Sequence, residues 1–119
     1  MGDKKIERFE DIIAWQKARE LVNHVYRVFN NTKDFNFREQ IQRASVSVMN
    51  NIAEGFERRT NNEFKHFLFM AKGSCGEVRS MLYAALDLKM ITEEIFNELM
   101  NFRRKFVKFF PVLLRHCKL

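Results

Sequence analysis

Apolar residues recur every three or four positions through four stretches of the chain, and this spacing constrains the fold more than any other feature. Such spacing places apolar side chains on one face of an α-helix. No stretch shows the alternating pattern of a strand. The clearest helical stripe consists of Phe64, Phe67, Leu68, Ala71, Cys75, Val78, Leu82 and Ala85.

Helix-starting signals mark where three of these stretches begin. Asn36–Glu39 and Thr60–Glu63 each place a side-chain acceptor three residues before a glutamate, which is the pattern of a capping box. Thr92 is followed by two acids, which favour a first helical turn. We therefore expect helices at about residues 10–29, 37–57, 61–89 and 93–115. Because Pro111 has no N–H to donate, we expect the last helix to kink or fray there.

Short connections between helices of this length favour an antiparallel up-and-down four-helix bundle. A chain of 119 residues is long enough for one domain with its own core. The predicted fold class is therefore all-α, with residues 1–119 forming a single four-helix-bundle domain.

The cysteines and the N-terminal residues indicate a cytoplasmic protein. Cys75 and Cys117 have no CxxC partner, which is typical of free thiols in a reducing compartment. The first residues are charged and no apolar segment follows them, so we expect no signal peptide. The longest apolar run has six residues, too few to cross a membrane.

The net charge of +6 is confined to the C-terminal end of the chain. Residues 1–100 carry as many acids as bases, so the whole excess lies in the last 19 residues. An acidic polymer such as RNA is the natural partner of such a patch. The alternative is a solvated helix C-terminus, where cations also interact favourably with the helix dipole. The candidate nucleic-acid contacts are Arg103, Arg104, Lys105, Lys108, Arg115 and Lys118, with Arg58 and Arg59 from the connection between helices 37–57 and 61–89.

Two helices carry a second face that indicates self-association. Helix 37–57 has a polar stripe of mostly short side chains away from its apolar face, and helix 61–89 has a face that bears methionines and few charges. Gly73 and Gly76 lie in mid-helix, where each glycine costs about 1 kcal/mol relative to alanine, a cost often tolerated where another backbone approaches closely. The alternative for the polar stripe is an ordinary solvated face. The candidate oligomer-interface residues are Arg43, Ser47, Asn51, Glu54, Met70, Gly73, Glu77 and Met81.

The sequence gives little sign of catalysis. The three histidines lie on different elements without ligand spacing, so we expect no metal site, and no phosphate-binding glycine loop follows a strand, so we expect no cofactor. Glu54 and Glu77 could form a carboxylate pair, but a structural partner such as Arg43 explains both acids more simply. We expect a protein that is not an enzyme.

Paired motifs in the middle of the chain resemble the signature of the 23S rRNA-intervening sequence proteins, also called the four-helix-bundle protein family. The resemblance covers roughly residues 9–91, including an opening helix with Phe9 and Ala14–Ala18. The motif residues are Gln40, Arg43, Ala44, Ser47, Asn51–Gly55, Arg59, Thr60, Glu63, Phe64, Phe67, Leu68, Ala71–Ser74 and Glu77.

This resemblance implies a four-helix bundle that assembles into a ring, typically a homopentamer. It also implies a relationship to the accessory variability determinants of diversity-generating retroelements, which bind a reverse transcriptase and its template RNA through a basic surface.

Three functions follow as alternatives. The first is a non-enzymatic RNA-binding or nucleoprotein-scaffold protein that forms a ring with a basic surface on its last helix. The second is an adaptor that binds a retroelement reverse transcriptase and its template RNA. The third is a structural oligomer without a nucleic-acid role, whose basic residues only increase solubility.

Overall fold

The computed structural model describes residues 6–116 and shows an all-α chain. A short 3-10 helix, η1 (Phe9–Asp11), precedes α1 (Ile13–Phe29), α2 (Phe35–Phe56), α3 (Asn61–Asp87) and α4 (Glu93–His116). The residues described include no strand, and the prediction of an all-α fold with four long helices is confirmed. In α4 the side chains left out of the description are those of Arg103, Phe106, Val107, Phe109, Phe110 and residues 112–116.

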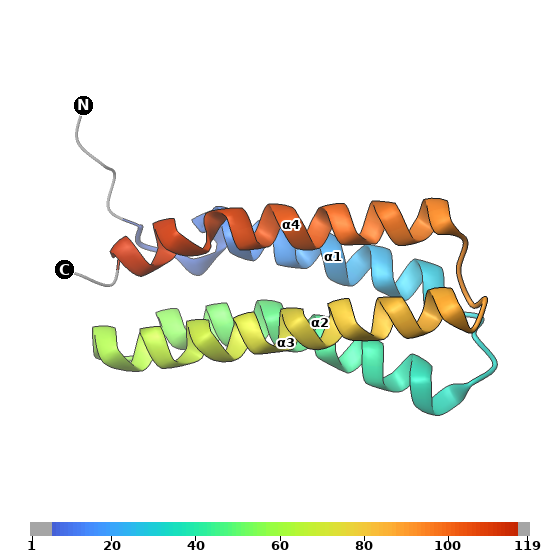
Figure 1. Ribbon diagram of the computed structural model, residues 1–119. Coiled ribbons are helices and arrows are strands. Elements are labelled where there is room, and N and C mark those ends of the chain that lie inside the picture. Colours follow the sequence, from blue (N-terminus) through green and yellow to red (C-terminus); the bar gives the residue numbers. More distant parts are fainter. Residues whose placement is uncertain (1–5, 117–119) are drawn as a thin grey trace.

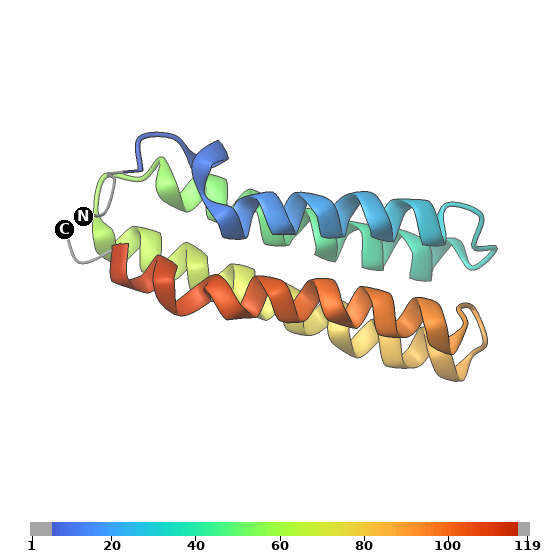
Figure 2. The same cartoon turned by 90° about the horizontal axis from the view of Figure 1, so that it is seen from above.

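The four helices lie alongside one another in two layers (Figures 1 and 2). One layer contains α1 and α4, and the other contains α2 and α3. The α1–α2 and α3–α4 loops lie at one end of the molecule, whereas the α2–α3 loop lies at the other end, near the last turns of α4 (Figure 1). The α2–α3 contact is the most extensive of the helix pairs and the α3–α4 contact the least.

The start of α1 differs from the prediction. Residues 9–11 form η1, and α1 begins at Ile13 rather than near residue 10. The Phe9 ring packs edge-on against Trp15 with 5.2 Å between centroids, and Gln16 Nε2 donates a 2.9 Å hydrogen bond to the Glu10 carbonyl. Arg8 donates a hydrogen bond to the Glu10 carboxylate and lowers the pKa of that carboxyl below its ordinary value. These local contacts favour a separate turn over one more turn of α1.

The residue that caps α2 is also not the one predicted. Asp34 is the N-cap, and its Oδ1 accepts a 3.1 Å hydrogen bond from the Phe37 N–H. Asn36 lies inside the first turn, so the Asn36–Glu39 capping box is wrong. An aspartate and an asparagine two residues apart are equally good caps by type, and the backbone path out of α1 selects between them.

The caps of α3 and α4 agree with the sequence. Thr60 and Glu63 form a complete capping box, with Thr60 Oγ1 accepting from the Glu63 N–H at 3.2 Å. Thr92 Oγ1 accepts from the Ile95 N–H at 3.2 Å. α3 ends at Asp87 because Lys89 adopts a left-handed φ of 59° and the Met90 N–H bonds back to the Ala85 carbonyl at 2.8 Å. The backbone of α4 continues through Pro111 to His116, so the helix does not end at the proline.

The core follows the predicted apolar stripes and divides into two clusters along the bundle. Near the α2–α3 loop it is built largely from small and β-branched residues, including Ala18, Val48 and the buried thiol of Cys75. Toward the other end larger side chains such as Phe29, Leu82 and Leu99 fill it. Trp15 is only half-buried, beside the first cluster. No helix in the part of the chain described is long and apolar enough to cross a membrane.

Candidate nucleic-acid and subunit interfaces

Three of the predicted nucleic-acid contacts are exposed on α4. Arg104, Lys105 and Lys108 are all solvent-exposed, and the Lys105 ammonium lies 5.6 Å from the centroid of the Phe102 ring. No acid follows Glu98 in the sequence, so this half of α4 carries basic charge alone. The side chains of Arg103 and Arg115 and all of Lys118 lie outside the residues described.

Arg58 and Arg59 belong to the α2–α3 loop, at the end of the molecule that also holds the C-terminal turns of α4 (Figure 1). The Arg58 guanidinium forms a 2.9 Å ion pair with Glu54 and lies 4.7 Å from the centroid of the Phe67 ring. Both arginines are exposed, but the Arg58 side chain is engaged by Glu54 and Phe67 of its own subunit.

A hollow of about 450 Å³ lies between α3 and α4 and has Arg104 in its wall. The Tyr83 ring packs edge-on against Phe96, with 5.1 Å between centroids, and closes one side of the hollow. The lining residues are Tyr83, Phe96, Asn97, Glu98, Met100, Asn101 and Arg104.

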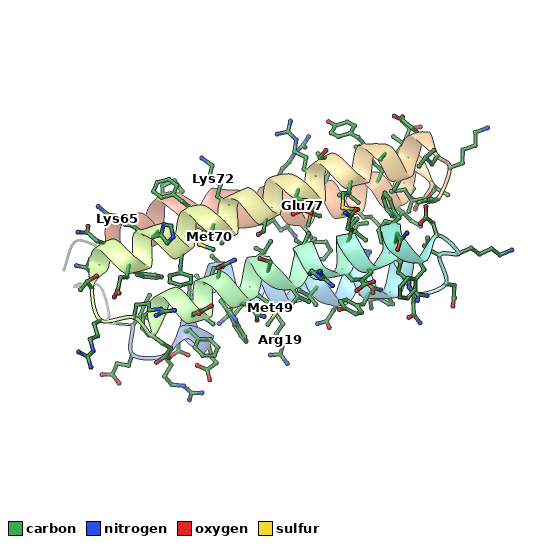
Figure 3. All side chains as sticks on the ribbon, turned by 90° about the horizontal axis from the view of Figure 1, so that it is seen from below. Arg19, Met49, Lys65, Met70, Lys72 and Glu77 are labelled. Atoms are coloured by element: carbon green, nitrogen blue, oxygen red, sulfur yellow. The ribbon has the colours of Figure 1, made fainter. Side chains whose placement is uncertain are left out.

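Sequence reasoning missed a second group of bases, on α3. Lys65, Lys72 and Arg79 are spaced seven residues apart, which places them on one line along the helix. Figure 3 shows Lys65 and Lys72 on the edge of α3 away from α2, whereas Met70 and Glu77 lie on the α2 side. The seven-residue spacing could have revealed the line, but it went unnoticed because acids elsewhere in residues 1–100 balance these charges.

Ser47 of the predicted oligomer interface instead joins α2 to α3 within the subunit, and Asn51 bonds to Ser47 from the next turn of α2. Ser47 Oγ and Ser74 Oγ lie 2.9 Å apart, and Asn51 Nδ2 donates to the Ser47 carbonyl at 2.8 Å and to its hydroxyl at 3.0 Å. Asn51 is buried and Ser47 is half-buried. The polar stripe of α2 therefore does not lie wholly on an outer face, because α3 covers its middle. The surface that the Ser47 side chain meets is α3 of the same chain.

The remaining interface candidates lie toward the outside. Arg43, Glu54 and Glu77 are exposed, Met70 is 44% exposed, and Met81 is half-buried against the core. Gly73 is also exposed, and a Cβ built on it would meet nothing within 4 Å. The space beside Gly73 is thus unoccupied within the subunit, and its filling by a second copy stays a prediction.

The partner expected for the two carboxylates is wrong. Arg43 pairs with Glu39 at 2.8 Å rather than with Glu54 or Glu77, and Glu54 pairs with Arg58. Each of these pairs joins residues four positions apart, whose side chains are neighbours on the helix surface. Such a local ion pair forms more readily than one that bridges two helices. Over the residues described, no group of three or more potential ligands could hold a metal ion.

These observations define an all-α, four-helix protein with a basic α3–α4 side. The model of one protein family, described as 23S rRNA-intervening sequence protein, matches residues 10–109. The chain therefore belongs to that family, as its motifs predicted. Comparison with the curated proteins gives no match.

A solved structure supports the fold. It is described as a protein with unknown function from the S23 ribosomal protein family, from Bacteroides thetaiotaomicron. It matches with a TM-score of 0.78 at 22% sequence identity, covering 85% of this chain and 97% of that chain. At this identity the likeness shows the fold alone.

Proposed function

We propose that the protein is a non-enzymatic RNA-binding protein, a nucleoprotein scaffold, that works as a ring of identical antiparallel bundles in the cytoplasm. Five subunits is the number that the family resemblance implies. The observation that carries the proposal is the segregation of charge. All of the net charge of +6 lies in the last 19 residues, and Arg104, Lys105 and Lys108 expose it on α4.

A ring would repeat this basic surface once per subunit. Repetition raises the local positive potential and lengthens the path that a polyanion can follow. Binding would be largely electrostatic, with weak sequence preference and strong dependence on salt, because each phosphate contact releases counterions.

The test is titration of purified protein against labelled single-stranded RNA at several salt concentrations. The variant Arg104→Gln/Lys108→Gln/Arg115→Gln should weaken binding and flatten the plot of log affinity against log salt by up to about 2, since each lost phosphate contact removes about 0.7. The matched control Arg19→Gln/Arg27→Gln/Lys33→Gln removes three exposed charges from α1 and the α1–α2 loop, and its affinity should stay closer to that of the unchanged protein.

The outcomes separate the alternative functions. Absence of RNA binding at low salt would contradict the proposal. Binding only after addition of a retroelement reverse transcriptase would favour the adaptor, and a neighbouring gene for that enzyme would point the same way. An equal loss of RNA affinity in both triple variants would show that only the net charge of the protein matters. That result would favour a structural oligomer without a nucleic-acid role.

A further inference from the structure

Six residues form one continuous row along α3: Lys65, Phe69, Lys72, Gly76, Arg79 and Tyr83. Successive members are four or three residues apart, so their side chains follow a single line on the helix. Along this line a base alternates with an aromatic ring or a glycine, and the line contains no acid. From Lys65 to Tyr83 it extends about 27 Å at the rise of an α-helix.

The row is accessible in the subunit. Phe69 is 55% exposed and Tyr83 is 48% exposed, while Lys72 and Arg79 are also exposed and Lys65 is half-buried. A Cβ on Gly76 would meet nothing within 4 Å, so the backbone itself is open at the middle of the row. Large aromatic side chains with this much exposed surface on one helix face can mark a binding surface.

The row lies on the α4 side of α3. Tyr83 packs against Phe96 of α4, whereas Phe67 and Ser74 of α3 make the contacts to α2. Figure 3 places Lys65 and Lys72 on the edge opposite the one that carries Met70 and Glu77. A ring assembled through Met70, Gly73 and Glu77 would leave this edge of α3 uncovered.

The hollow between α3 and α4 adjoins the row at Tyr83. The Arg104 side chain and the amides of Asn97 and Asn101 also line it. The one acid in its lining, Glu98, lies 3.4 Å from His24 Nε2, on the side that faces α1. Basic charge from α3 and α4 thus meets beside an exposed aromatic ring.

Resting on the nucleic-acid binding proposed above, we propose that this α3 row, with Arg104, is a binding track for single-stranded nucleic acid. The rings of Phe69 and Tyr83 stack on unpaired bases, while Lys65, Lys72, Arg79 and Arg104 contact phosphates. Alternation of rings and cations is how proteins hold single strands without reading sequence. A duplex cannot use the rings, since its bases are already stacked and paired. The excess of cations favours a polyanion over a second α3 row, whose like charges would repel it.

The test compares a labelled single-stranded oligouridylate of about 16 nucleotides, at the upper end of typical site sizes, with an RNA duplex of the same length. The variant Phe69→Leu/Tyr83→Leu removes both stacking surfaces and keeps apolar, helix-forming side chains and every charge. We expect it to weaken single-strand binding about 10- to 100-fold, with little change in the salt slope or in duplex affinity. The variant Lys72→Gln/Arg79→Gln should weaken binding to both probes and flatten the single-strand slope by about 1.4.

The matched control is Tyr26→Leu/Phe35→Leu, which removes two other exposed rings, 42% and 58% accessible, from α1 and α2. It should bind the single strand like the unchanged protein. Equal single-strand affinity for the Phe69→Leu/Tyr83→Leu variant would overturn the track, and so would an equal loss of duplex binding. A lower oligomer mass for that variant in light scattering would also overturn it and assign the row to a subunit contact. If instead the unchanged protein binds neither probe at low salt, it is the proposed function itself that fails.

Discussion

At the scale of single residues, Gly55 marks a position where α2 and α3 approach each other closely. A Cβ at this position would lie 2.6 Å from Phe67 Cβ and 3.1 Å from Phe64 Cδ1. The atom 2.6 Å away is the base of a side chain rather than its flexible end, so it can move only with the backbone of α3. Gly76 is the opposite case, because nothing lies within 4 Å of its Cβ position.

We predict that Gly55→Ala lowers the free energy of unfolding by about 1–3 kcal/mol, as overpacking of a tight contact does. Gly76→Ala should raise the same quantity by up to about 1 kcal/mol, because alanine loses less backbone entropy in a helix. Urea denaturation of both variants measures the difference. A Gly55→Ala variant as stable as the unchanged protein would contradict the close approach of α2 and α3 at this position.

At the scale of the elements, the starts of α2, α3 and α4 each have one capping side chain, and α2 shows how local that choice is. The Asp34 carboxylate accepts from the Phe37 N–H at 3.1 Å, while Asn36 lies within the helix and caps nothing. Both residues are exposed, so a change at either leaves the core untouched.

Asp34→Ala should therefore lower the free energy of unfolding by about 0.5–2 kcal/mol, the usual contribution of an N-cap. Asn36→Ala, two residues further on, should be neutral or slightly stabilising because alanine is the better helix former. Thermal denaturation followed by circular dichroism measures both. If Asn36→Ala lowered the free energy of unfolding more than Asp34→Ala, the N-cap of α2 would be Asn36, as the sequence predicted.

At the scale of the whole molecule, α3 has two flanks with different chemistry. One flank carries Met70 and Glu77 beside the open space at Gly73, and the other carries the cation and aromatic row. If the first flank joins subunits and the second binds a single strand, assembly would line the ring with repeated copies of the row.

Replacing Gly73 tests the first half of this arrangement. Gly73→Phe should leave the subunit folded, because its side chain enters unoccupied space, but should lower the oligomer mass measured by light scattering. Asn23→Phe, at an exposed position on α1, is the control and should keep the mass of the unchanged protein. An oligomer mass that Gly73→Phe does not alter would remove this face from the subunit contact.

The spacing of apolar residues was enough to determine the four helices and their core. Phe64, Leu68 and Val78 recur at helical spacing whatever surrounds them, and the Thr60–Glu63 box starts α3 through hydrogen bonds made within one turn. Such features depend on residues close together in the chain, so they can be predicted from the sequence alone.

Only the tertiary structure decided which face of each helix is covered, and by what. On a helical wheel of α2 alone, Ser47 and Asn51 belong to a polar stripe. The position of α3 instead puts Ser47 in contact with Ser74 and leaves Asn51 buried. In the same way, Lys65, Lys72 and Arg79 are three ordinary surface bases in the sequence. They become part of one basic side only because the fold brings α4, with its own exposed cations, alongside α3. Contacts between residues far apart in the chain depend on how helices pack, and no single helix encodes that packing.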